Sequence, residues 1–157
     1  MYHKLNLLRK VLFLFSLLVF SITITSCEDD PVAPQEEHLK AIGMVFYSSG
    51  IEVARILRGV TTDTLFAPLD NLSDHMDVMF LDEDEKLVDP PTEHQKLNSE
   101  VDDPTTVDMW QHPGEEGAFE FHLEGFKIGE TSIEFFVMHN DHADFRSGKI
   151  PVKVIEK

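Results

Sequence analysis

The sequence predicts an all-β fold, a small antiparallel β-sandwich, on the strength of three observations. From Ala41 onward, apolar side chains recur mostly at every second position, which is the period of a half-buried strand. Prolines and glycines interrupt these runs at short intervals, as a sandwich of short strands requires. Helical composition is confined to 83–87, which is too short for an ordinary helix. We therefore expect strands throughout the folded domain.

The first two expected strands form a hairpin. The apolar-rich runs 42–47 and 51–58 flank the turn-forming stretch 48–50, Ser-Ser-Gly. The next strand is expected at 75–80, where every second residue is apolar. The acidic segment 82–85 that follows lacks the ligand and glycine spacing of an EF-hand, so we interpret it as a solvated hairpin tip.

Three later runs predict the remaining strands. In 117–124 the apolar residues share one face and the polar residues share the other, as in a half-buried strand. The run 131–138 is apolar on both faces, which indicates a central strand, and 150–154 supplies the last strand. The stretch 89–105 has few apolar residues and several prolines, so we expect a long loop there.

The N-terminus has the order of a signal peptide. Lys4, Arg9 and Lys10 precede an uncharged apolar run, 11–24, that ends in small polar residues. This run is shorter than the roughly 20 residues that a membrane-spanning helix needs. We therefore expect residues 1–26 to be a helical signal peptide and not an uncleaved anchor.

The residues Ile24-Thr25-Ser26-Cys27 resemble the lipobox of bacterial lipoproteins. The resemblance implies that Cys27, the only cysteine of the chain, is acylated and becomes the first residue of the mature protein. Residues 27–39, acidic and proline-containing, are then a disordered tether, and 40–157 form one domain. The acidic run 28–30 is similar to a signal that some Gram-negative phyla use to export lipoproteins to the surface. We expect an outer-membrane lipoprotein, periplasmic or surface-exposed.

The C-terminal part resembles bacterial Ig-like modules. Gly125 and Gly129 match the Gly-x-x-x-Gly turn of these modules, and Thr131-Ser132-Ile133 matches the start of the strand that follows. The similarity covers about residues 60–155 and departs where such modules place a tryptophan segment, since Trp110 lies later. It implies an Ig-like β-sandwich, a fold that carries no activity by itself.

The charge of the chain restricts its partners. The sequence has 13 basic and 29 acidic residues and a formal net charge of −16, and removal of the basic signal peptide makes it more acidic still. Binding to nucleic acid requires a basic patch that neutralises phosphates. We therefore expect no nucleic-acid partner, and membrane contact through the lipid anchor alone.

One histidine-rich segment is a candidate metal site. His139 and His142 lie three residues apart between two expected strands, with Asp141 between them and another carboxylate following. Nitrogen and oxygen ligands of this kind suit zinc or another divalent transition metal. If the segment joins the last two strands of an Ig-like sandwich, His38 before the first strand is expected to approach it. The alternative is a polar turn stabilised by local Asn and Asp hydrogen bonds.

These features favour a non-enzymatic function. The sequence contains no nucleophile elbow, phosphate-binding glycine loop or zinc-protease motif. The leading hypothesis is a membrane-anchored Ig-like module that binds a partner protein or surface ligand. The alternative is a lipoprotein that binds or carries a divalent metal, such as zinc, through the segment 139–144.

Overall fold

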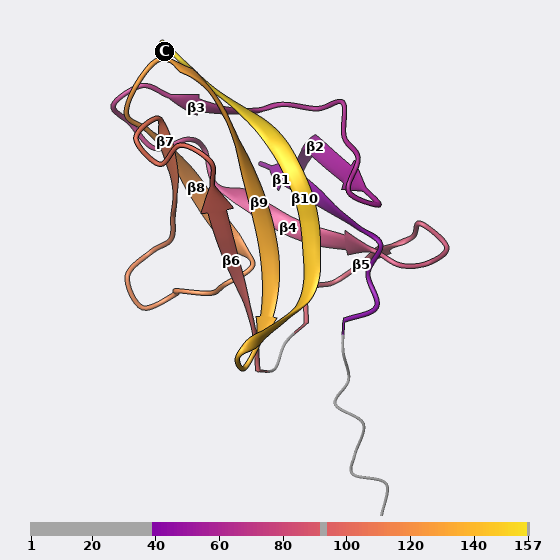
Figure 1. Ribbon diagram of the computed structural model, residues 1–157. Helices are drawn as coiled ribbons and strands as arrows, with labels where there is room; N and C mark the ends of the chain where they lie inside the picture. Colours follow the sequence, from indigo (N-terminus) through magenta and orange to yellow (C-terminus); the bar gives the residue numbers. More distant parts are fainter. Residues whose placement is uncertain (1–38, 92–93, 157) are drawn as a thin grey trace, which may run out of the picture. The chain divides into compact units, whose positions relative to one another are not determined.

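Residues 39–91 and 94–156 are described by a computed structural model and form two β-sheets (Figure 1). The larger sheet has the strand order β2-β1-β4-β8-β7, with β5 paired to β4, and the smaller sheet has the order β3-β10-β9-β6. No helix capable of crossing a membrane occurs in these residues. The strands are β1 (Gly43–Ser48), β2 (Ile51–Leu57), β3 (Leu65–Pro68), β4 (Met76–Leu81), β5 (Leu87–Val88), β6 (Gln95–Val101), β7 (Val107–Trp110), β8 (Glu120–Gly125), β9 (Gly129–His139) and β10 (His142–Ile155).

The two sheets pack face to face across one hydrophobic core. Phe46 of the larger sheet lies 5.0 Å from Phe135 of the smaller sheet, measured between ring centroids, and Phe121 lies 5.0 Å from Phe135. All three rings are essentially inaccessible to solvent, and burial of such a side chain contributes roughly 1.5–3 kcal/mol. All named strand pairs are antiparallel except β3 with β10. The predicted antiparallel β-sandwich is therefore confirmed, while the predicted signal peptide and tether lie outside the described residues, apart from Leu39.

The predicted hairpin at the start of the domain is present as β1 and β2. Its two central turn residues, Ser49 and Gly50, have φ angles of +52° and +76°. A two-residue turn with positive φ at both positions has the twist that antiparallel strands need. Gly50 adopts this conformation without strain because it lacks a Cβ atom. The predicted acidic hairpin tip is also present, at the turn between β4 and β5, where Asp82 Oδ1 accepts hydrogen bonds from the amides of Asp84 and Lys86.

The prediction of a long loop at 89–105 is wrong, because the seven-residue strand β6 lies in the middle of it. This strand pairs only with β9 and forms one edge of the smaller sheet. An edge strand needs few apolar residues, and in β6 only Leu97 is buried. Its polar composition therefore gave no sign of a strand. The short strands β3 and β7 were not predicted either.

The long strands β9 and β10 form the hairpin that carries the histidine-rich segment. They run side by side along the sheet, and their turn lies beside the start of β6 at the bottom of Figure 1. Ile133, Phe135 and Val137 of β9 point into the core, together with Ile150, Val152 and Val154 of β10. Val137 and its register partner Phe145 are the core residues of this hairpin that lie nearest its turn.

Candidate metal centre

The turn between β9 and β10 places two imidazole rings next to each other. His139 is the last residue of β9, His142 is the first residue of β10, and the two are direct partners in the strand register. Asn140, the first of the two turn residues, has a φ of +52°, a left-handed conformation that asparagine tolerates better than most residues. The ring centroids of His139 and His142 are 5.6 Å apart.

A β-bulge brings the carboxylate of Asp144 to the two rings. The register of β10 against β9 shifts between Ala143 and Phe145, so Asp144 is the extra residue of the bulge. Bulges of this kind change the direction of a side chain. The Asp144 side chain is fully shielded from solvent, with Oδ1 3.0 Å from His142 Nε2 and Oδ2 3.5 Å from His139 Nδ1.

A residue of the neighbouring strand orients this carboxylate. Gln95, the first residue of β6, pairs with His139 across the sheet and donates a hydrogen bond of 2.6 Å from Nε2 to Asp144 Oδ2. Hydrogen bonds to a ligating carboxylate fix its orientation and are a regular feature of metal sites. Three strands, β6, β9 and β10, therefore converge on one carboxylate and two imidazoles.

The donor set and its spacing fit a divalent transition metal. The possible ligand atoms of His139, His142 and Asp144 all lie within 4.8 Å of one another. Two ligands bound at about 2.0–2.1 Å in a tetrahedral zinc site are separated by about 3.3 Å. The two measured nitrogen-to-oxygen distances, 3.0 and 3.5 Å, bracket that value. Small side-chain shifts would bring all three groups onto one ion.

The structure brings together part of the predicted ligand set. His139 and His142 lie together as expected, but Asp141 lies at the exposed tip of the turn and is not a member of the group. Asp144 takes the place expected for Asp141, because the bulge turns it toward the rings. His38 and Cys27 lie outside the described residues.

A second group of possible ligands was missed by the sequence analysis. His75 Nδ1 lies 3.5 Å from Asp77 Oδ1, and His75 Nε2 lies 3.3 Å from Glu120 Oε2, all on the outer face of the larger sheet. The only sequence signal was that polar residues alternate with buried ones at 75–77 and 120–122. That signal does not indicate that β4 and β8 are neighbours, so the group could not be predicted from it.

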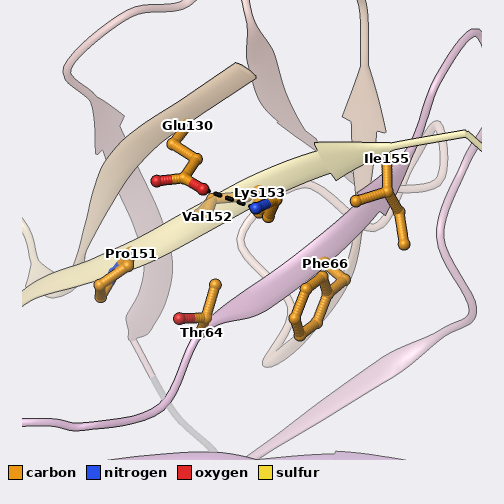
Figure 2. A pocket seen from close by; sticks show the side chains of 7 residues that line it. All are labelled: Thr64, Phe66, Glu130, Pro151, Val152, Lys153 and Ile155. Atoms are coloured by element: carbon orange, nitrogen blue, oxygen red, sulfur yellow. Dashed lines mark ion pairs between the residues drawn. The ribbon is translucent and has the colours of Figure 1, made fainter. Parts of the chain in front are cut away.

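A hollow lies on the smaller sheet and is lined by residues of β3, β9 and β10 (Figure 2). Its two charged side chains, Glu130 and Lys153, point toward each other, and their ion pair measures 2.7 Å. The hydrogen bond from Lys153, reinforced by its positive charge, lowers the pKa of the Glu130 carboxyl below its ordinary value. Glu130 is therefore an ionised pairing partner and not a proton donor at neutral pH. Phe66 and Ile155 form the exposed apolar side of the hollow.

Comparison with known proteins identifies no family for this chain. No protein-family model matches the chain, and no curated protein matches it. Among solved structures, it is similar to the crystal structure of the S-layer protein SbsC domains 4 and 5, with 16% sequence identity and a TM-score of 0.39. The similarity covers 59% of this chain and 47% of that chain, so this protein spans about half of it. At this TM-score the likeness supports no conclusion about function.

Proposed function

We propose that this protein is a lipid-anchored envelope protein whose β-sandwich binds a divalent transition-metal ion at the β9–β10 turn. The observation that carries the proposal is the convergence of His139, His142 and the buried carboxylate of Asp144. Imidazole nitrogen favours zinc and its transition-metal neighbours over calcium and magnesium, which prefer oxygen ligands.

The exposure of the three side chains favours reversible binding. The side chains of Asp144 and His139 are 0% and 13% exposed, whereas that of His142 is 49% exposed. An ion can therefore enter and leave from the His142 side, while the buried carboxylate supplies an electrostatic attraction that solvent screens only weakly. Three protein ligands also leave a fourth position for water or a partner ligand. This arrangement suits binding, carrying or sensing of a metal.

Zinc binding by the tag-free protein, purified in detergent, tests the proposal. Calorimetry is expected to detect a site with a dissociation constant below about 100 µM, which corresponds to about −5.5 kcal/mol. His142→Ala should weaken it about tenfold, because water can replace an exposed ligand at moderate cost. His94→Ala, an exposed loop histidine outside the group, is the matched control and should leave the affinity unchanged. Equal affinities in the wild type and His142→Ala would show that the turn binds no metal.

The proposed anchor is tested separately at Cys27. Changing Cys27 to alanine removes the only thiol that an acyl chain can modify, so the protein should move from the detergent phase to the aqueous phase. Phase separation with a nonionic detergent followed by immunoblotting measures this. A Ser26→Ala variant, which keeps the thiol and a small preceding residue, should stay in the detergent phase. Membrane retention of Cys27→Ala at the wild-type level would instead indicate an uncleaved anchor helix.

Binding of a partner protein or surface ligand is the second candidate function. The hollow on the smaller sheet favours it, because Phe66 and Ile155 remain 52% and 40% exposed beside the edge strand β3. Exposed apolar groups on a sheet edge are common features of docking surfaces. The zinc calorimetry distinguishes the two candidate functions. If the turn binds no zinc, a tethered domain that docks a partner is the function that the structure supports better.

A further inference from the structure

Three histidine rings lie in a row on the outer face of the larger sheet. The ring centroids of His75 and His122 are 5.2 Å apart, and those of His122 and His112 are also 5.2 Å apart. Trp110, the register partner of His122 in the β7–β8 pair, lies 4.8 Å from His112 and 5.6 Å from His122. We call His75, His122 and His112 the histidine row.

The hydrogen bonds of His122 fix which of its nitrogens holds a lone pair. His122 Nδ1 lies 2.9 Å from the backbone carbonyl oxygen of Ser73. Because a carbonyl oxygen only accepts, Nδ1 donates, and in the neutral ring Nε2 is left with its lone pair. Ser73 is itself held in place, since its amide bonds to the Leu123 carbonyl and its hydroxyl accepts from the Leu123 amide. Histidines that bind metals commonly have their second nitrogen bonded to a carbonyl in this way.

The lone pair of His122 Nε2 faces a second imidazole nitrogen. His112 Nε2 lies 3.3 Å away, which is about the separation of two nitrogen ligands on a tetrahedral zinc-like ion. Without an ion, this spacing also suits a hydrogen bond from His112 to His122. When an ion binds, the exposed His112 ring carries its proton on Nδ1 instead, so both Nε2 atoms present lone pairs and no net proton is lost.

We propose that His112 and His122 bind a divalent transition-metal ion of the class that prefers imidazole ligands, with copper(II) as a member. The carboxylates of Asp77 and Glu120 lie within 3.5 Å of His75, whose ring is 5.2 Å from that of His122, so this face of the sheet carries negative charge that attracts a cation. This site is on the larger sheet and shares no residue with the β9–β10 turn. A result that excludes metal binding at the β9–β10 turn would therefore not exclude metal binding by His112 and His122.

Trp110 provides a reporter for this site because it is the only tryptophan of the chain. Copper(II) quenches indole emission at short range, so copper(II) added in large excess over the tag-free protein in detergent should quench Trp110 along one saturable curve, which binding at the β9–β10 turn does not shift. His112→Ala removes a ligand, and loss of a hydrogen bond that only orients a ligand already costs about 10–100-fold in metal affinity. The copper(II) concentration at half-quenching should therefore rise at least tenfold. His112 is exposed in a loop, so the variant should keep the wild-type circular dichroism spectrum.

Two controls make the result specific. His142→Ala removes a ligand of the other site and His94→Ala removes an unrelated loop histidine, and both should leave the Trp110 quenching curve within twofold of the wild type. His112→Asn, a polar replacement without an imidazole, should behave like His112→Ala. Quenching that is unchanged in both His112 variants, or that is lost in His142→Ala, would overturn the proposal.

Discussion

Replacing Gly125 with alanine is expected to lower the free energy of unfolding by about 3 kcal/mol, the upper part of the range for overpacked positions. A Cβ atom at Gly125, the last residue of β8, would lie 2.5 Å from the carbonyl oxygen of Pro68 and 2.7 Å from Val154 Cγ1. Pro68 and Val154 belong to the smaller sheet, so the added methyl group would press into the contact between the two sheets. Relief of the clash requires movement of backbone and not of a flexible side chain.

The backbone around Gly125 has little freedom to move. The Asp70 amide donates to the Gly125 carbonyl at 2.8 Å, and the Leu69 amide donates to the Ile155 carbonyl at 2.9 Å. The chain directly after Pro68 is therefore bonded to both sheets. On the other side, the Phe126 amide donates to the carbonyl of Thr106, a buried residue, at 2.9 Å. Shifts that make room for a methyl group break or lengthen some of these bonds.

Gly129 supplies the control for this substitution. An added Cβ there would meet nothing closer than Thr106 Cγ2 at 3.7 Å, which is ordinary van der Waals contact. Gly129→Ala should be neutral or should stabilise the domain by about 0.5 kcal/mol, because alanine lowers the entropy of the unfolded chain. Equilibrium unfolding in urea measures both variants. If Gly125→Ala proved as stable as Gly129→Ala, the sheets would not approach closely at Gly125.

The Gly-x-x-x-Gly motif located the turn between Gly125 and Gly129 but did not reveal that the two glycines have different surroundings. Their spacing matched the Gly-x-x-x-Gly turn of bacterial Ig-like modules, and the turn does lie between β8 and β9. The motif treats both positions alike, whereas the structure gives them different surroundings. Only Gly125 is required by a close approach of backbone, and that approach involves residues far away in the sequence.

Most of the fold could be predicted from the alternation of apolar residues. Strands β4 and β8 and the predicted part of β10, 150–154, bury apolar residues at every second position, so the period of two was visible. β9 was predicted as a central strand because it also carries apolar residues on its other face, and it does lie between β10 and β6. β6 was missed because pairing with β9, not burial of its own side chains, makes it a strand. The strand β3 was missed because it has only four residues and because its parallel partner, β10, is distant in the sequence.

The candidate metal centre could be located but not completed from the sequence. The spacing of His139 and His142 indicated a site at the turn, since residues that flank a two-residue turn face each other. Asp144, and not Asp141, lies beside the imidazoles because of a β-bulge that cannot be predicted from the sequence. The histidine row depends on the adjacency of β4, β8 and β7, which alternation within a single strand does not reveal.

Asp144→Asn is expected to weaken zinc binding at the turn by at least about 100-fold, or about 2.7 kcal/mol. The substitution keeps the size of the side chain and an oxygen that can accept from Gln95, but it removes the negative charge that faces both imidazoles. A buried anionic ligand contributes more to binding a dication than an exposed neutral one, because the surrounding protein screens its charge weakly. The effect should therefore exceed the tenfold loss expected for His142→Ala.

Asp141→Asn is the matched control, because it is the same chemical change three residues earlier, at the exposed tip of the same turn. It should leave the zinc affinity within about twofold, since water and dissolved salt screen an exposed charge. Calorimetry at pH 7.5, where most free histidine side chains are neutral, compares the three proteins. If Asp141→Asn weakened binding and Asp144→Asn did not, the ligand would be the residue suggested by sequence spacing. The bulged carboxylate would then serve only to hold the turn together through Gln95.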